Sequence, residues 1–158
     1  LARTAVRLMR QLGTPCLIHQ PHYNLLDRWV EAELLGLLER EGVGCIAFCP
    51  LAQGVLTDRY LGGIPEGSRA SKPHGFLKPA HITPETMAIV ERLNGLARAR
   101  GQSLAQMALA WVLRSPAVTS ALIGASRLEQ IQEAVGALKG AAFTADELAL
   151  IDAALKRS

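Results

Sequence analysis

The sequence predicts an α/β fold built on a short parallel sheet. Three near-continuous apolar stretches, residues 16–20, 44–48 and 118–123, have the length of strands, and helical periodicity fills the segments around them. Strands separated by helices form parallel βαβ units, and unbroken apolar stretches are typical of parallel strands covered on both faces. Because three strands leave two unpaired edges, we also expect the isolated chain to self-associate, a homo-oligomer being one such form.

The first half of the chain begins with an amphipathic helix over residues 2–12. Its apolar stripe consists of Val6, Leu8, Met9 and Leu12. Gly13 and Pro15 provide the stop signal before the first strand. A second helix covers residues 31–41 with four leucines toward the core, and Gly42 ends it before the second strand.

Residues 49–82 form a long connection rich in Gly, Pro, Ser and basic residues. Connections of this length inside compact domains are usually functional or mobile. We therefore expect residues 49–82 to be a mobile loop that orders when a ligand binds.

Helices dominate after this loop. Thr83 caps a helix that runs to about residue 100, and residues 103–106 form a capping box for the next helix. The buried face of that helix consists of Leu104, Met107, Ala108, Trp111 and Val112. Two further capping boxes, at 126–129 and 144–147, open the helices that follow the third strand.

The composition excludes several classes of protein. The 158 residues are 49% hydrophobic and 20% charged, which rules out a largely disordered chain. A net charge of +3 spread along the sequence and 4% aromatic residues predict no nucleic-acid partner. No apolar run approaches the ~20 residues that span a bilayer, so we expect no membrane partner.

The cysteines and the first residue indicate the chain's origin. There are three cysteines, Cys16, Cys45 and Cys49. This odd number argues against disulfides and predicts the reducing cytoplasm, with Cys16 and Cys45 buried in apolar runs. Their spacing from His19 and His22 matches no zinc pattern, so no metal site is predicted. The chain starts at Leu1 without Met, and we expect it to be a portion of a longer protein.

Two candidate sites follow the second and third strands, at the carboxyl ends where parallel sheets bind ligands. Gly124, Ser126 and Arg127 combine close backbone approach, a helix N-terminus and a permanent cation. The turn at 48–54 offers backbone amides to a phosphate group. Each motif also fits a structural role, as a capped helix with a surface arginine or as a simple turn.

Two further candidates are basic and amide side chains. Arg59 and Arg69 flank a flexible segment and fit a phosphate clamp, or else they are solvated charges. Gln20 ends the first strand, where its amide reads a carboxamide or simply ends the strand. The sequence has no Gly-x-Gly-x-x-Gly and no Gly-Lys-Ser/Thr motif, which argues against an ordinary Rossmann or P-loop site.

Four segments, in this order, resemble the aldo-keto reductases. They are QPHYNLLDR at 20–28, FCPLAQG at 48–54, GIPEGSR at 63–69 and LIGAS at 122–126. The resemblance runs across essentially the whole chain and is strongest toward bacterial L-glyceraldehyde 3-phosphate reductases and potassium channel β subunits. It implies a (β/α)8 barrel that binds NADPH over its C-terminal face. It also implies that this chain is the C-terminal part of that α/β barrel, namely strands six to eight with their helices.

The resemblance assigns the NADPH contacts residue by residue. Gln20 resembles the glutamine that binds the nicotinamide carboxamide, and Phe48 resembles the aromatic residue that stacks on the nicotinamide ring. The pyrophosphate stretch is Cys49, Leu51, Ala52 and Gln53, with Gly54 giving room. Arg59 and Arg69 resemble the basic pair near the adenosine 2′-phosphate. The adenosine end is Gly124, Ser126, Arg127, Gln130 and Glu133. Ala134 stands where the family usually has Asn, which removes one adenine hydrogen bond.

The family's catalytic Asp, Tyr, Lys and His lie on early strands, and no residue of this chain matches them. The nearest residue types are Tyr23, Tyr60, His19 and His22, none at a tetrad position. We expect the intact protein to reduce a small aldehyde, such as glyceraldehyde 3-phosphate or methylglyoxal, with NADPH, and this chain alone to be inactive. The alternatives are a non-catalytic, NADPH-binding regulatory module like a channel β subunit, or an unrelated α/β domain with accidental motif matches.

Overall fold

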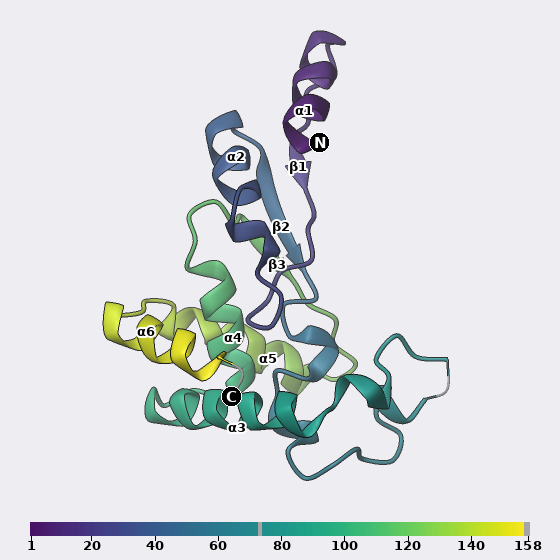
Figure 1. The fold of residues 1–158 in the computed structure, drawn as a ribbon, viewed down its shortest axis with the longest axis vertical. Helices are drawn as coiled ribbons and strands as arrows, with labels where there is room; N and C mark the ends of the chain where they lie inside the picture. Colours follow the sequence, from purple (N-terminus) through teal and green to yellow (C-terminus); the bar gives the residue numbers. More distant parts are fainter. Residues whose placement is uncertain (73, 157–158) are drawn as a thin grey trace.

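The computed structural model describes residues 1–72 and 74–156 and has the predicted α/β architecture (Figure 1). Residue 73, inside the expected loop, and residues 157–158 lie outside the described residues. In chain order the helices and strands are α1 (Ala2–Gln11), β1 (Ile18–His19), α2 (Leu34–Glu41), β2 (Gly44–Phe48), α3 (Pro84–Ala99), α4 (Leu104–Leu113), β3 (Ser120–Leu122), α5 (Leu128–Gly136) and α6 (Ala145–Ala154).

The three strands form one parallel sheet in the order β1–β2–β3, which confirms the predicted strand arrangement. Ile18 lies opposite Gly44, and Phe48 lies opposite Leu122. β1 is shorter than the predicted strand at 16–20, since Cys16, Leu17 and Gln20 lie outside it. Pro21, which has no N–H to donate to a ladder, follows. The chain nevertheless stays beside β2 after this proline, and a parallel bridge joins His22 to Phe48.

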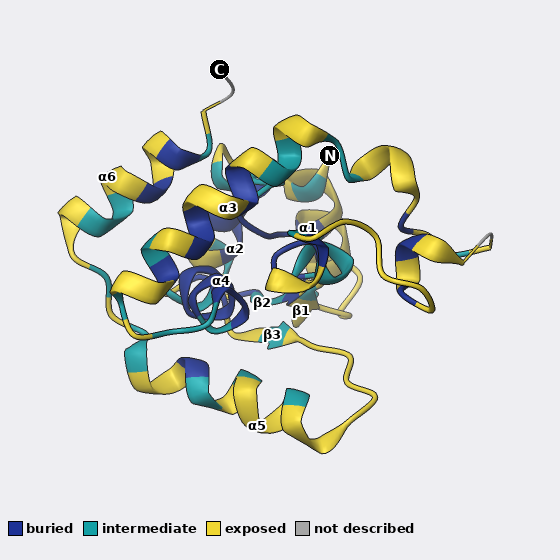
Figure 2. Ribbon diagram, turned by 90° about the horizontal axis from the view of Figure 1, so that it is seen from below, coloured by how far each residue is buried: buried dark blue, intermediate teal, exposed yellow. Residues whose placement is uncertain are grey.

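Helix α4 is the centre of the core. The sequence predicts one buried face, but the structure buries almost the whole helix, including Ala105, Leu109 and Ala110. Figure 2 shows α4 enclosed, and it packs against α3, α5 and β3. A helix that is apolar all round belongs in the interior.

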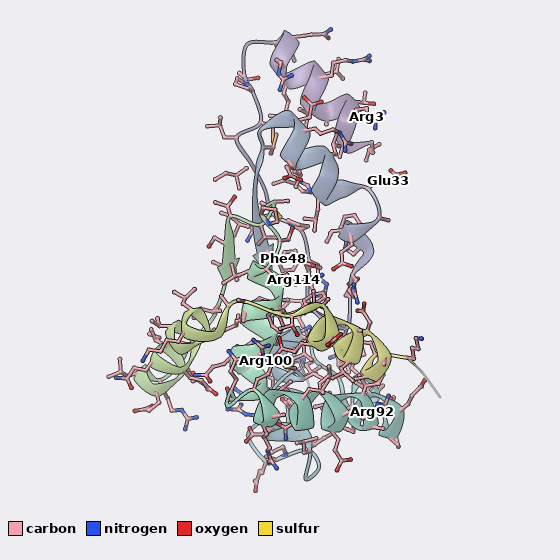
Figure 3. The ribbon with its side chains drawn as sticks, turned by 90° about the vertical axis from the view of Figure 1, so that its left-hand side faces the viewer. Arg3, Glu33, Phe48, Arg92, Arg100 and Arg114 are labelled. Carbon is pink, nitrogen blue, oxygen red and sulfur yellow. The ribbon has the colours of Figure 1, made fainter. Side chains whose placement is uncertain are left out.

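Trp111 of α4 ties the helices to the segment that follows β1. Its ring lies 5.4 Å from that of Tyr23, and the guanidinium groups of Arg28 and Arg114 lie 5.0 and 3.7 Å from its centre. Arg114, labelled in Figure 3, is the residue at the C-terminal end of α4. Aromatic and cation–π contacts of this kind add to the stabilisation from burial.

Two helices leave apolar faces exposed. In α1 only Val6 is buried, whereas Leu8, Met9 and Leu12 of the expected stripe are exposed. In α5 the exposed apolar residues are Leu128, Ile131 and Val135. Amphipathic spacing therefore predicted these helices, but it does not say whether a partner covers the stripe. The helix expected up to residue 139 also divides, because α5 ends at Gly136 and a 3₁₀ turn (Ala137–Gly140) follows.

The long connection after β2 is less irregular than its composition indicates. It contains 3₁₀ turns at Ala52–Gly54, Asp58–Tyr60, Arg69–Ser71 and Pro79–His81. Leu56, Tyr60 and Leu77 are buried in the core, whereas residues 62–67 are exposed. The two ends of the loop are thus anchored by packing, and its mobility stays a prediction. Among the described residues, no helix is both long and apolar enough to cross a membrane.

Candidate functional site

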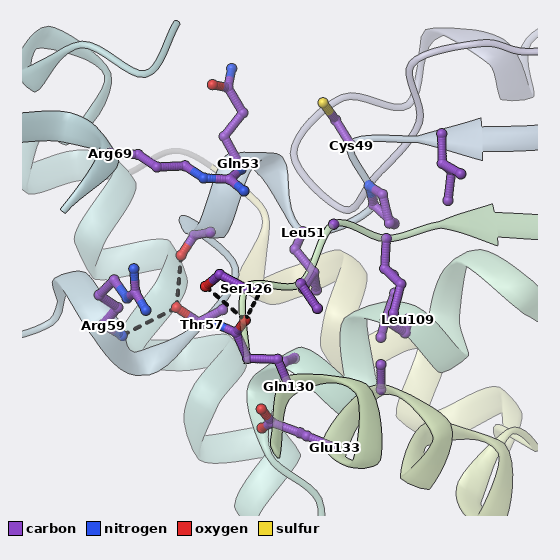
Figure 4. Close-up of a pocket in the computed structure, with 18 of the residues that line it drawn as sticks. Cys49, Leu51, Gln53, Thr57, Arg59, Arg69, Leu109, Ser126, Gln130 and Glu133 are labelled. Atoms are coloured by element: carbon purple, nitrogen blue, oxygen red, sulfur yellow. Dashed lines mark hydrogen bonds between the residues drawn. The ribbon is translucent and has the colours of Figure 1, made fainter. Parts of the chain in front are cut away.

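A pocket of about 590 Å³ opens where β2 and β3 end (Figure 4). Its volume lies within the range of small-molecule and cofactor sites. The structure brings together all the predicted site residues except Gln20 and Ala52. Those in the lining are Phe48, Cys49, Leu51, Gln53, Gly54, Arg59, Arg69, Gly124, Ser126, Arg127, Gln130 and Glu133. Gln20 is exposed just beyond β1, and Ala52 packs against the core instead.

The turn after β2 has an unusual backbone. Cys49, Ala52 and Gln53 have φ angles of 54°, 46° and 59°, in the left-handed region that L-residues rarely adopt, and Gly54 has φ of 100°. Each such non-glycine residue costs on the order of 1–3 kcal/mol. Strain of this kind clusters at ligand-binding sites, because the surrounding structure must hold it in place.

The buried side chain of Asn24 holds this turn. Its amide nitrogen donates to the carbonyl oxygen of Cys49 at 3.0 Å, and its Oδ1 accepts from the backbone amides of Leu26 and Asp27. The turn also bonds internally, since the amide of Gly54 donates to the carbonyl of Leu51. The Gly54 amide is therefore already hydrogen-bonded within the turn. It is not one of the free backbone donors that the sequence predicted for a phosphate group here.

The β3–α5 junction differs from the expected capping box. Helix α5 begins one residue later, at Leu128, and Ser126 does not cap it. Instead Oε1 of Gln130 accepts from the amides of Ser126 and Arg127, at 2.8 and 3.2 Å, and from the Ser126 hydroxyl at 3.3 Å. The Gln130 side chain is long enough to accept from both amides. These N–H groups were predicted to be free to bind an anion, but they are already hydrogen-bonded.

Arg59 and Arg69 bring positive charge to one side of the pocket. Thr57 fixes the backbone at Arg59: its hydroxyl donates to the Gly54 carbonyl at 2.7 Å and accepts from the Arg59 amide at 3.2 Å (Figure 4). Arg69 extends toward the third strand: its Nη2 lies 3.9 Å from where a Cβ on Gly124 would be. Both guanidinium groups thus border the same space as the β3–α5 junction.

Glu133, a further residue of the lining, is held by the N-terminus of α4. The Ser103 hydroxyl donates to its carboxylate at 2.6 Å, and the Gln106 side-chain amide donates to its backbone carbonyl at 3.2 Å. The same two residues form the predicted capping box of α4, which is confirmed. One motif therefore both begins the central helix and positions a pocket residue.

Phe48 stands at the mouth of the pocket, with 36% of its surface exposed. The imidazole of His22 meets it edge-on, with ring centroids 5.1 Å apart and planes 65° apart. Nδ1 of His22 lies 2.7 Å from Oδ2 of Asp27. His22, Asp27 and Asn24 were not among the predicted site residues. The segment 24–27 does carry an Asx-turn signal that points to this loop.

Helix α4 contributes two apolar residues to the pocket that were not predicted. They are Ala105 and Leu109, which line it together with Leu51. The all-round apolar character of residues 104–113 is the signal that this helix lies inside, but spacing alone does not say what it underlies.

No tyrosine of the chain lines the pocket. Tyr23 and Tyr60 are both buried, and neither belongs to the lining. Burial, together with the hydrogen bond to Glu31, raises the pKa of the Tyr23 phenol well above its ordinary value. Burial likewise raises the pKa of the Cys45 thiol, while Cys16 is half-buried rather than buried as expected. Within residues 1–72 and 74–156, no cluster of three or more His, Cys, Asp or Glu side chains could hold a metal ion.

Comparison with known proteins agrees with the four motifs. The sequence model of the Aldo/keto reductase family matches residues 2–156. L-glyceraldehyde 3-phosphate reductase of Escherichia coli (strain K12) is 53% identical over 152 residues, which are 93% of this chain and 44% of that protein. A Schizosaccharomyces pombe protein that bears the name voltage-gated potassium channel subunit beta is 40% identical over 124 residues, which are 76% of this chain and 36% of that protein.

The chain spans less than half the length of these relatives. The resemblance read from the motifs is nevertheless confirmed, since the family match covers nearly every residue. The chain belongs to the aldo-keto reductase family.

Proposed function

We propose that this chain is the NADPH-binding, C-terminal portion of an aldo-keto reductase that reduces small aldehydes such as glyceraldehyde 3-phosphate or methylglyoxal. The observation that carries the proposal is the pocket itself. It gathers all but two of the residues that the family resemblance assigns to the cofactor, the exceptions being Gln20 and Ala52. The name of the Escherichia coli relative supports the substrate class.

The residues present fit a phosphorylated dinucleotide. The pocket holds three arginines, Arg59, Arg69 and Arg127, at the positions where phosphate and adenosine are expected. Gly124 leaves room for close backbone approach, since the nearest group that a Cβ would meet there is the Arg69 guanidinium, 3.9 Å away. The strained turn at Cys49 is a further mark of a ligand-binding backbone.

When bound, NADPH supplies a hydride to the carbonyl carbon of the aldehyde. The chain's own residues bind and orient. Arg59 and Arg69 bind the 2′-phosphate, and Phe48 offers an apolar ring surface to the nicotinamide. Glu133, fixed by Ser103, accepts hydrogen bonds at the adenosine end. Ala134 has no polar side chain to contribute there.

We further propose that the three-stranded sheet and its helices are part of a larger (β/α)8 barrel. The exposed apolar residues support this, because Leu12 after α1, Ile18 in β1 and Leu128 in α5 are 77%, 56% and 64% exposed, and further barrel elements would cover such side chains. A barrel closes the sheet and removes its edges. Light scattering tests this: the isolated chain is expected to self-associate, and a monodisperse monomer would contradict the proposal.

The tyrosine that donates the proton in this family has no counterpart among the described residues that line the pocket. Tyr23 and Tyr60 are buried away from the lining, so this chain by itself is proposed to bind NADPH without turnover. The same observation favours a second candidate function, a regulatory module that binds NADPH and turns nothing over, and the channel subunit name of the fission yeast relative adds to it.

The location that we propose for the protein is the cytoplasm. All three cysteines are free, in keeping with a reducing cytoplasm.

NADPH titration followed by fluorescence, with a turnover assay on methylglyoxal and glyceraldehyde 3-phosphate, tests the proposal. The chain is expected to bind NADPH and to give no turnover. The longest natural chain that contains this sequence is expected to reduce the aldehydes if it is an enzyme, and to bind without reduction if it is a regulatory module. Absence of NADPH binding by both would refute either function.

A further inference from the structure

We propose that His22 is a positioning residue that sets the orientation of the Phe48 ring toward the nicotinamide. The inference rests on the proposed function, because it concerns one end of the proposed NADPH site. His22 is outside the pocket lining and acts only through Phe48. Four observations on the described residues carry it.

The backbone of Phe48 is fixed on both sides. Its amide donates to the carbonyl of Pro21 at 3.0 Å, and its carbonyl accepts from the amide of Tyr23 at 3.3 Å. On the other side Phe48 pairs with Leu122 of β3. These bonds place the Cα of Phe48, but the ring stands partly in solvent and needs a further contact to fix its plane.

His22 supplies that contact. Its ring meets the Phe48 ring at 5.1 Å and 65°, the edge-on arrangement that aromatic pairs prefer. An isolated parallel bridge joins the two residues, so His22 lies beside Phe48 at the end of β2 although it is outside β1. A ring braced at its edge keeps its face available to a flat ligand.

The imidazole is itself held in place. Nδ1 lies 2.7 Å from Oδ2 of Asp27, and a carboxylate only accepts, so Nδ1 carries the proton of this hydrogen bond. Asp27 is fixed in turn, because it exchanges two backbone hydrogen bonds with Asn24, both at 3.1 Å. Asn24 also holds the carbonyl of Cys49, the residue after Phe48. The brace and the ring therefore belong to one hydrogen-bonded unit.

A purely structural role explains the pair less well. The side chains of His22 and Asp27 remain 33% and 44% exposed, so they contribute little core packing. Asn24, fully buried in the same loop, already carries the structural contacts. What His22 adds to the loop is its contact with the one aromatic ring at the pocket mouth.

The test separates the two ends of the cofactor. His22→Ala is expected to weaken NADPH binding by about 2- to 10-fold, the range of an aromatic pair, and to leave the affinity for adenosine 2′,5′-bisphosphate unchanged, because this probe has no nicotinamide. His22→Phe restores the edge contact and is expected to restore NADPH affinity. His19→Ala, at a half-buried site of β1 outside both the lining and the 49–82 loop, is the matched control and is expected to change neither.

An independent readout needs no ligand. The chain has three phenylalanines, so the ring signals of Phe48 can be assigned by NMR, and they are expected to shift in His22→Ala and return in His22→Phe. Equal loss of both ligands in His22→Ala, an unchanged NADPH affinity, or unmoved Phe48 signals would overturn the inference. If the wild-type chain binds neither ligand while the Phe48 signals shift as expected, the proposed function fails and the brace remains only a local contact.

Discussion

The side-chain amide of Asn24 donates a hydrogen bond to the carbonyl oxygen of Cys49 at 3.0 Å, across 25 residues of sequence. This bond joins the loop after β1 to the strained turn after β2. Without it, a left-handed cysteine would have to be maintained by the turn's own hydrogen bonds. The geometry of the pocket mouth therefore depends on a buried residue that does not line the pocket.

Replacing Asn24 tests this dependence. Asn24→Asp keeps the acceptor for the amides of Leu26 and Asp27 but loses the donor to Cys49, whose carbonyl then accepts only from the Ala52 amide. The loss of one such hydrogen bond costs about 0.5–1.5 kcal/mol. Asn24→Ala loses the acceptor as well and is expected to cost more. Urea unfolding measures both. If the two variants unfold at the wild-type midpoint, the bond to Cys49 is not what maintains the turn.

Arg59 and Arg69 are expected to discriminate between NADPH and NADH. Hydrogen bonds to a charged group contribute about 1.5–3 kcal/mol, so Arg69→Ala is expected to weaken NADPH binding by roughly 10- to 100-fold and NADH binding far less. Arg59→Ala is expected to act in the same direction. Arg98→Ala, an exposed arginine of α3 outside the lining, serves as the control. Equal losses for the two cofactors in Arg69→Ala would remove the 2′-phosphate from this part of the pocket.

Glu31 is expected to make the fold sensitive to acid. It accepts from Tyr23 at 2.6 Å, Arg114 at 3.0 Å and Arg28 at 2.8 Å. Burial disfavours its charged form, but these hydrogen bonds outweigh burial and lower the pKa of the carboxyl. Because the folded pKa lies below the unfolded one, its contribution is complete above the unfolded pKa of about 4.3 and is lost as pH falls through the folded pKa.

Glu31→Gln therefore lowers the free energy of unfolding at neutral pH and flattens its decline below about pH 4.3. Urea titrations across the acid range measure the effect. Glu33→Gln, at an exposed position shown in Figure 3, is expected to follow the wild type. An acid decline in Glu31→Gln as steep as in the wild type would mean that other carboxylates carry it.

The loop at 49–82 is expected to become protected when NADPH binds. Glu66 lies in its exposed segment and is the sole glutamate between Glu41 and Glu85, so a glutamate-specific protease reports on this position. Cleavage after Glu66 is expected to slow with NADPH present, as the loop orders over the cofactor. Cleavage at Glu91 in α3 provides the internal control. Equal rates at Glu66 with and without NADPH would show that the loop does not close.

Much of this architecture follows from local signals in the sequence. The capping boxes at Ser103 and Thr144 and the cap at Thr83 begin helices where expected, because each supplies an oxygen to an otherwise unpaired amide. Ser126 does not cap its helix as expected. The Gln130 side chain accepts from the amides of Ser126 and Arg127 instead. Competition between two possible caps is decided by side-chain geometry, which residue type does not reveal.

The site shows a similar division. Most of the residues that the motifs single out lie in one pocket, whereas Gln20 follows a strand whose end does not reach this lining. The stripe of α1 was predicted to be apolar but is exposed. Helical periodicity shows that Leu8 and Met9 share an apolar face, but it does not show which segment packs on that face. His22 and Asn24 escaped notice because their roles arise from contacts between segments distant in sequence.

A crystal structure of this chain with NADPH would show directly whether the pocket binds the cofactor. We expect density along the pocket at the ends of β2 and β3, with the nicotinamide on Phe48 and the 2′-phosphate between Arg59 and Arg69. Cofactor bound elsewhere, or bound in the reverse direction with its adenosine on Phe48, would contradict this expectation.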